Sequence, residues 1–159
     1  MKQSLPYSNF KFLDENEIKS FDIFNVKEDD SVGYILEVDL EYPEELHDQH
    51  NDLPLAPEKL NVTPEMLSPY ALRLADKIDV KFNKCEKLVP NFTKKEKYVI
   101  HYTNLQLYLN LGMKLVHIHR ILQFDQSPWL AKFIDFNTEK RQQATNEFEK
   151  QFYKLMNNR

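Results

Sequence analysis

The sequence has few of the residues on which several common site types depend. Cys85 is its only cysteine, and Gly33 and Gly112 are its only glycines. One cysteine excludes an internal disulfide framework and a cysteine-based zinc site. Two isolated glycines exclude a glycine-rich phosphate loop. No long apolar run and no signal-type N-terminus is present, so we expect neither a membrane span nor secretion. An intracellular protein of the nucleus or cytoplasm is the simplest interpretation.

Apolar residues are nevertheless frequent enough for a core. The 159 residues include eleven phenylalanines and eight tyrosines, which argues against disorder along the whole chain. The length suits one compact domain or a large part of one. The formal net charge of −4 provides no general attraction to nucleic acid. Any such binding therefore requires a local cationic patch.

Hydrophobic periodicity predicts an α+β fold. Residues 33–42 alternate strictly, with Tyr34, Leu36, Val38, Leu40 and Tyr42 on the buried face of a strand. Residues 113–124 alternate in the same way, which places Leu115, His117, His119 and Ile121 on one face and Ile118 on the other. Shorter strands are expected at 86–91 and 97–102, separated by a turn at 93–96. Cap-then-proline or Thr-cap signals predict helices over 70–78, 104–111 and 129–136.

Other segments predict surface connections or core positions. Residues 14–20, 25–30 and 81–87 are polar and are expected on the surface as connections or, for the last, a loop or hairpin. Thr103 is the expected cap of the helix over 104–111, and Gly112 its end. Leu72, Leu74 and Ala75 are expected to face inward from their helix. Trp129, Phe133 and Phe136 have helical spacing, which indicates core packing more than a ligand site.

Histidines and acids suggest two metal sites that we do not favour. The loop 47–57 carries His47, Asp48, His50 and Asp52, but no spacing among them defines a coordination geometry. His117 and His119 are expected on one strand face, but no third ligand accompanies them. A polar surface loop and a partly exposed sheet face are the preferred interpretations.

The last stretch, residues 135–159, predicts an amphipathic helix, with Asn137 and Thr138 as a break or cap before it. Steps of 100° per residue group one polar side and one apolar side. The polar side contains Lys140, Gln143, Glu147, Lys150, Lys154 and Asn158, and the apolar side Ala144, Phe148, Phe152, Leu155 and Met156. Lysines on such an edge suit a polyanion such as a triphosphate. On geometry alone, an ordinary solvated face is the better explanation.

The same stretch carries a family resemblance. The segment FEKQFYKLMNN, residues 148–158, resembles the start of the finger-helix motif of family B DNA polymerases, in which a lysine precedes Asn-Ser by four residues. Lys154 matches that lysine and Asn158 that asparagine. Longer blocks resemble the protein-primed-type polymerases of Polinton/Maverick-like transposons and related viruses. These blocks are LPYSNFKF (5–12), GYILEVDLEYPEELHDQHNDLPLAPE (33–58), HYTNLQLYLNLGMKLVHIHRILQF (101–124) and SPWLAKFIDFNTEKRQQA (127–144).

The resemblance implies template-directed addition of deoxynucleotides to a primer, for the replication of a mobile element or virus. It implies that Lys154 contacts the phosphates of the incoming nucleotide, that Lys150 assists, and that Asn158 lies near the nucleotide and the template pair. A further cation about a dozen residues before the motif lysine is common in the family. Arg141 fits that pattern better, whereas Lys140 shares the face of Lys154 on a straight helix, so both stay open.

The resemblance also implies what the chain does not contain. The two metal-binding carboxylate motifs of the family, which hold two Mg²⁺ ions, would lie on either side of residues 1–159. Residues 1–126 would be a palm portion with an inserted subdomain, and residues 127–159 finger helices. The implied partners are template-primer DNA, a deoxynucleoside triphosphate and a terminal-protein primer. The chain alone is expected to be inactive. A non-catalytic nucleotide- or nucleic-acid-binding module, or a decayed remnant, is the alternative.

One acidic segment resembles a metal motif only superficially. Residues 39–43, DLEYP, are similar to the aspartate motif of other family B enzymes, but Glu37 stands where that motif has its aspartate. We therefore interpret Glu37, Asp39 and Glu41 as an exposed strand face and not as metal ligands.

Overall fold

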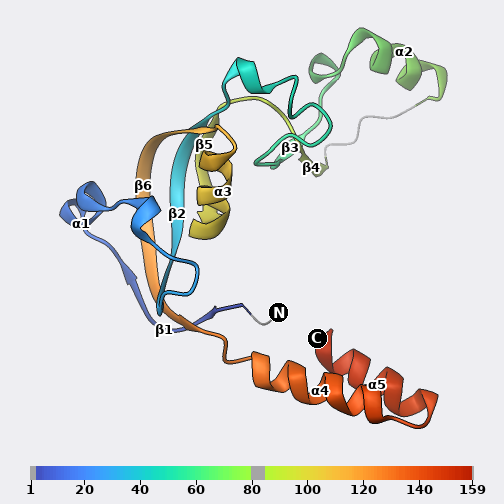
Figure 1. The fold of residues 1–159 in the computed structure, drawn as a ribbon. Coiled ribbons are helices and arrows are strands. Elements are labelled where there is room, and N and C mark those ends of the chain that lie inside the picture. The colour runs from blue at the N-terminus through green and yellow to red at the C-terminus, as the bar shows by residue number, and fades with distance from the viewer. Residues whose placement is uncertain (1–2, 80–84, 159) are drawn as a thin grey trace.

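Two long antiparallel strands, β2 (Val32–Glu41) and β6 (Lys114–Ser127), form the centre of a four-stranded sheet. The structure is a computed structural model that describes residues 3–79 and 85–158. Strand β1 (Leu5–Phe12) pairs with β6, and β5 (Lys95–His101) pairs with β2, so the order is β1-β6-β2-β5 with every pair antiparallel. Figure 1 shows the sheet as a curled layer with helices beside it, which confirms the predicted α+β class.

Strand β2 confirms the predicted alternation almost residue for residue. Leu36, Val38 and Leu40 are completely buried, and Tyr42 just beyond the strand is 5 % exposed. Because successive side chains of a strand point to opposite faces, this one segment defines the core side of the sheet. The strand begins one residue before the predicted start and ends one residue before the predicted end.

Strand β6 does not alternate as predicted, because its pairing with β2 is interrupted twice. The core pairs across the two strands are Leu36 with Ile121, Val38 with Ile118, and Leu40 with Leu115. The register shifts between consecutive pairs, so the inward residues of β6 are three apart and not two. A β-bulge moves every following side chain to the other face. The prediction that Ile118 points to the other face of the strand from Leu115 and Ile121 is therefore wrong.

Helix α3 (Tyr102–Asn110) packs on the core side of the sheet through Tyr102 and Leu105. Gly112, at a φ of +102°, follows its end as predicted, since this left-handed conformation suits glycine. The predicted Thr103 cap is wrong. His101 occupies the cap position, and Thr103 Oγ1 lies 2.8 Å from His101 Nδ1 in a hydrogen bond.

Residues 14–20, predicted as a connection, mostly form helix α1 (Glu15–Ser20). The Asp14 carboxylate accepts hydrogen bonds from the backbone N–H groups of Asn16 and Glu17, and Glu17 accepts one from the Asp14 N–H. This reciprocal capping box satisfies N–H groups that a short helix otherwise leaves open. A 3-10 turn, η1 (Ile23–Asn25), follows and places Ile23 in the core.

An insertion separates β2 from β5 along the chain and lies at one end of the sheet (Figure 1). It contains the turns η2 (Glu44–Leu46) and η3 (Pro64–Met66), the helix α2 (Pro69–Lys77), and the strands β3 (Glu58–Asn61) and β4 (Glu86–Val89). Within the part of the chain that the structure describes, β3 and β4 pair only with each other. Ala75 of α2 is buried as predicted, but Leu74 is 44 % exposed, so its inward placement is wrong. Of the segment 81–87, residues 81–84 lie outside the described residues.

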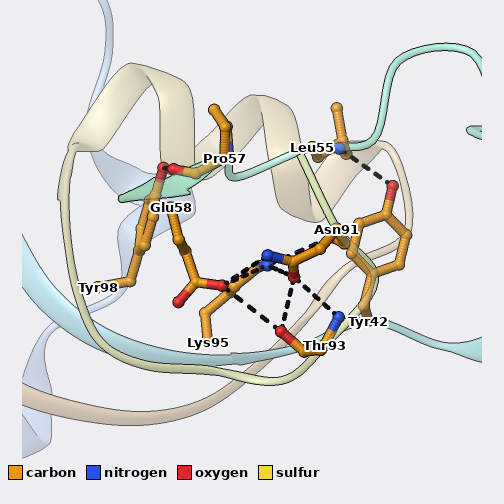
Figure 2. Close-up of polar contacts among 8 residues, drawn as sticks. All are labelled: Tyr42, Leu55, Pro57, Glu58, Asn91, Thr93, Lys95 and Tyr98. Carbon is orange, nitrogen blue, oxygen red and sulfur yellow. Dashed lines mark hydrogen bonds and ion pairs between the residues drawn. The ribbon is translucent and has the colours of Figure 1, made fainter. Parts of the chain in front are cut away.

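A buried lysine joins this insertion to the main sheet (Figure 2). Lys95, predicted in the turn at 93–96, is the first residue of β5 and is completely buried. Its ammonium donates to Glu58 Oε2 at 2.8 Å, to the Asn91 carbonyl at 3.2 Å, and to Asn91 Oδ1. Two further bonds cross the same junction. The Tyr98 hydroxyl donates to the Pro57 carbonyl, and the Tyr42 hydroxyl accepts from the Leu55 N–H.

Removing the carboxylate of this pair should destabilise the protein. We expect Glu58→Gln to lower the free energy of unfolding by about 2 kcal/mol, because the buried Lys95 ammonium loses its charged partner. Urea unfolding measures the change. Glu96→Gln is the matched control, since Glu96 pairs with Lys94 at 3.8 Å on the surface and such pairs contribute little. Equal stability of the two variants would contradict the role given to Lys95.

Candidate functional site

The C-terminal cations lie on two helices, not on one. Helix α4 (Ala131–Gln143) follows β6, and helix α5 (Glu147–Asn157) runs back along it, so the two form an antiparallel hairpin (Figure 1). The helix predicted over 129–136 thus continues to Gln143. The predicted break at Asn137 and Thr138 is wrong, because Asn137 is buried within α4 and Thr138 Oγ1 donates to the Ile134 carbonyl.

The actual break lies at residues 144–146. Ala144 is extended, and the Asn146 side chain accepts a hydrogen bond from the Glu149 N–H at 2.9 Å. Asparagine is a favoured helix cap because its side-chain oxygen satisfies an N–H that has no partner within the helix. An asparagine three residues before Glu149 resembles a capping signal, and it was the feature in the sequence that could have located the break.

The interior of the hairpin is unusually polar. Ile134 and Asn137 of α4 are buried, and Lys150, Tyr153, Met156 and Asn157 of α5 are half-buried. Asn157 Nδ2 donates to Thr138 Oγ1 at 3.2 Å across the helices. Asn137 Nδ2 and Asn157 Oδ1 are buried without a hydrogen-bond partner among the described residues. Because buried polar atoms without partners are costly, these two atoms lower the stability that the interface contributes.

The break changes which cations face each other. Since α4 and α5 are antiparallel, the residue that follows Thr138 on α4 lies at the level of the residue that precedes Asn157 on α5, and so on along the helices. Three steps from this contact, Arg141 reaches the level of Lys154. On α4, Arg141 lies 60° from Thr138, whereas Lys140 lies on the opposite side, near Phe136, at about 100° per residue. The predicted sharing of one face by Lys140 and Lys154 is wrong, because it assumed a straight helix.

The five predicted site residues differ in their local contacts. Lys154 and Arg141 are exposed and form no hydrogen bond or ion pair with any residue of the described ranges. Lys150 Nζ donates to Glu147 Oε1 at 3.1 Å. Lys140 Nζ lies 5.7 Å from the centre of the Phe136 ring. Asn158 caps α5 with its N–H bonded to the Leu155 carbonyl.

The hairpin also differs from the rest of the chain in charge. Residues 127–159 contain six lysines and arginines against four acids, whereas residues 1–126 contain fifteen against twenty-one. The local cationic patch that an acidic chain needs for polyanion binding is therefore available here and not on the sheet.

A pocket lies at the root of the hairpin, where β5 passes into α3 and β6 passes toward α4. Its volume is about 510 Å³, and His101, Gln126 and Pro128 are among its lining residues. Burial lowers the pKa of His101, so the imidazole is neutral near pH 7. Gln126 Nε2 donates to the Tyr102 hydroxyl at 2.8 Å, which links the end of β6 to the start of α3. Glu28 and Asp29 also line the pocket, so it carries acidic as well as neutral polar side chains.

The acidic face of β2 is engaged in ion pairs. The guanidinium of Arg120 donates to Glu37 and lowers the pKa of that carboxyl. The Lys97 N–H donates to Asp39, whose carboxylate also lies 2.8 Å from His119 Nε2, and both contacts lower the pKa of Asp39. Glu37 and Asp39 are less exposed than we predicted. Across the described residues, no three His, Cys, Asp or Glu side chains are grouped as metal ligands.

The loop histidines have local structural contacts. His50 Nδ1 lies 2.7 Å from the Tyr42 hydroxyl, and the His47 ring stacks on Phe92 with 4.3 Å between ring centres. His117 contacts only the edge of the His119 ring among the aromatic side chains. These contacts agree with the surface-loop and sheet-face interpretations.

Sequence reasoning did not predict the exposure of the apolar side chains in the hairpin region. Trp129, Phe133 and Phe136 are 56 %, 41 % and 54 % exposed, so their predicted core position is wrong. Phe148, Phe152 and Leu155 of α5 are also exposed. Periodicity identified both apolar stripes but could not show that these side chains stay exposed. None of the described helices is long and apolar enough to cross a membrane.

Comparison with known proteins identifies one family. The model of the family described as "DNA polymerase type B, organellar and viral" matches residues 1–159, the whole chain. No curated protein and no solved structure matches the chain.

Replacing the cap of α5 tests the break that creates the hairpin. We expect Asn146→Ala to speed amide hydrogen exchange in α5 by an amount equivalent to about 1 kcal/mol, because a helix cap is lost. Asn146→Asp should preserve the protection. If α4 and α5 formed one continuous helix, Asn146→Ala would instead slow the amide exchange, since alanine inside a helix is more favourable than asparagine. Slower exchange in Asn146→Ala would therefore contradict the hairpin.

Proposed function

Because the chain belongs to the organellar and viral type B DNA polymerases, we propose that its helical hairpin binds the triphosphate of an incoming deoxynucleotide during template-directed DNA synthesis. The observation that carries the proposal is the Thr138–Asn157 contact, from which helix geometry places Arg141 and Lys154 at one level of the hairpin. Neither cation has an ion-pair partner among the described residues. Two cations at one level of a hairpin suit a polyanionic chain of phosphates.

Each cation has a distinct part in this proposal. Lys154 contacts the phosphates as a flexible point charge, and Arg141 adds a planar, bidentate donor from α4. Lys150 assists one turn before Lys154, although Glu147 shares its charge. Asn158 lies near the nucleotide and the template pair. Lys140 is the weaker candidate for the second cation, because its ammonium rests on the Phe136 ring.

The assignment of residue ranges to the parts of a polymerase follows the order of the strands and helices. We propose that residues 1–126 are a palm portion with an inserted subdomain, and that residues 127–159 are finger helices. The last residue of β6, Ser127, marks the change from sheet to helices. The deoxynucleotide and a template-primer duplex are the substrates that the family implies, and a terminal-protein primer suits the transposon and viral members that the chain resembles.

Phosphoryl transfer in such enzymes uses divalent metal ions held by carboxylates. The residues present do not fit two Mg²⁺ ions: Glu37 and Asp39 are committed to ion pairs, and no ligand cluster occurs in the described ranges. We therefore propose that other segments of the polymerase supply the metal ligands, and that this chain alone extends no primer. Template-directed extension by the purified chain with Mg²⁺ would contradict this.

A non-catalytic binding module is the second candidate function. It is favoured by the cationic excess of residues 127–159 within an otherwise acidic chain. Nucleotide or DNA binding without extension agrees with both candidates, and only a polymerase that includes the flanking segments separates them. Absence of any binding would favour a remnant without a retained role.

The triphosphate contact is tested by neutralising one lysine. We expect Lys154→Gln to weaken binding of a deoxynucleoside triphosphate to the chain by about tenfold, since a hydrogen bond to a charged group contributes roughly 1.5 kcal/mol or more. Titration followed by NMR chemical shifts measures the affinity. Lys59→Gln, an exposed lysine on β3, has the same charge change and should have no effect. Equal weakening by both variants would contradict a specific phosphate contact.

A further inference from the structure

An apolar groove lies beside the 3-10 turn η1. Its volume is about 420 Å³, and its walls come from residues 21–24, from the end of α3 and from the first half of β6. The apolar side chains that line it include Phe21, Phe24, Leu109, Met113, Leu115 and Ile118. Phe24 is 58 % exposed although it lines the groove. The groove therefore presents apolar surface that the fold of this chain does not fully cover.

Carboxylates lie on one side of this groove. A neighbouring pocket of about 530 Å³ shares Phe21 and Asp22 with the groove and is also lined by Glu17 and Asp30. Asp22 and Asp30 accept hydrogen bonds from backbone N–H groups at 2.9 Å and 2.8 Å, and neither forms an ion pair within the described residues. Residues 14–30 contain seven acids and two lysines. An apolar group accompanied by cations is therefore complementary to this surface.

Helix α4 carries such a group. Phe136 is 54 % exposed, and at 100° per residue Lys132 and Lys140 lie within about 40° of it on either side. The Lys140 ammonium lies 5.7 Å from the centre of the Phe136 ring. The nearest acid on α4, Glu139, lies about 60° from Phe136, and its carboxylate accepts a hydrogen bond from Gln143 at 3.0 Å. The exposed ring is thus flanked by two cations and one acid.

The Phe136 ring cannot reach the groove of its own chain. The groove contains Ile118 near the start of β6, and α4 follows the other end of that strand at Ser127. Nine residues of strand span about 30 Å. Figure 1 shows α4 leading away from the sheet, apart from α1 and the turn that follows it. A groove of this kind is therefore available to the ring only on a second copy of the chain.

We propose that Phe136 of one copy docks in the apolar groove of a second copy, with Lys132 and Lys140 near the carboxylates of Asp22 and Asp30. Burial of the ring stabilises the contact, and the opposite charges set its orientation. Both surfaces occur on this chain with complementary chemistry, which favours a second copy over an unrelated protein. The contact joins two different surfaces, so it is heterologous, and a pair of chains keeps one ring and one groove free.

This contact goes beyond the triphosphate binding proposed for the hairpin and does not rest on it. Arg141 lies about 140° from Phe136 around α4, and Lys154 belongs to α5. Lys154→Gln should therefore leave self-association unchanged. The two proposals fail separately, since one concerns nucleotide affinity and the other the mass of the particle in solution.

Sedimentation velocity of the full chain tests the contact. We expect the average mass to rise with protein concentration in roughly the micromolar range, and salt at about 1 M to weaken the association by screening the charges. Phe136→Ser should weaken association about tenfold, because the buried ring is lost. Phe148→Ser is the matched control, since Phe148 is exposed on α5 and the same change there should have no effect. Circular dichroism checks that each variant retains its helices.

Mixing two variants tests the heterologous geometry. Phe24→Lys adds a cation to the groove and should abolish association, while the Phe136 ring of that variant stays intact. Phe136→Ser removes the ring and leaves its own groove intact. We expect an equal mixture of the two to form a particle of two chains and no larger, because the ring of one fits the groove of the other and no second contact remains. Formation of that particle also shows that both variants are folded.

Four results would overturn the inference. One is the mass of a single chain at every concentration. Another is association of Phe136→Ser as strong as that of the unchanged chain. The third is equal weakening by Phe136→Ser and Phe148→Ser, which would indicate a general effect of exposed apolar surface. The fourth is a mixture of Phe24→Lys with Phe136→Ser that stays monomeric although both retain their helices.

Discussion

The buried ammonium of Lys95 constrains the arrangement of the whole sheet side of the molecule. A charge removed from water needs a close partner and satisfied hydrogen bonds, or the fold loses several kcal/mol. Glu58 and Asn91 meet that need, and both belong to segments that would otherwise contact the sheet only loosely (Figure 2). The ion pair, together with the Tyr98–Pro57 and Tyr42–Leu55 hydrogen bonds, therefore holds β3 in position relative to β5. The insertion and the sheet are joined as one unit, even though β3 and β4 pair only with each other.

Different interactions hold the hairpin of α4 and α5 together. Its two helices make their main contacts with each other, and their interface contains asparagines whose polar atoms are not all paired. Such an interface gives less stability than an apolar one of the same size.

How far the sequence could predict these features depends on the kind of interaction that determines each one. The alternation of β2 was predictable because Leu36, Val38 and Leu40 obey the period of a regular strand. The same reasoning failed for β6, since bulges depend on the partner strand and change the period from two to three. Lys95 looked like a turn residue because only its distant partners Glu58 and Asn91 make its burial tolerable. The four cations and Asn158 were identified by resemblance, but their grouping depended on the Asn146 cap, which a straight-helix assumption overlooked.

The strand order has a consequence for how the chain folds as it is synthesised. Strands β1 and β2 do not pair with each other, because β6 lies between them, and β6 is made long after both. Until then, the edges of β1 and β2 that pair with β6 have no partner, and β2 carries three fully apolar core positions. Long-range pairings of this kind slow folding and leave intermediates prone to aggregation. Emergence of β6 from the ribosome is thus the event that closes the sheet, and a chaperone that shields β2 until then would be expected to raise the yield of folded protein.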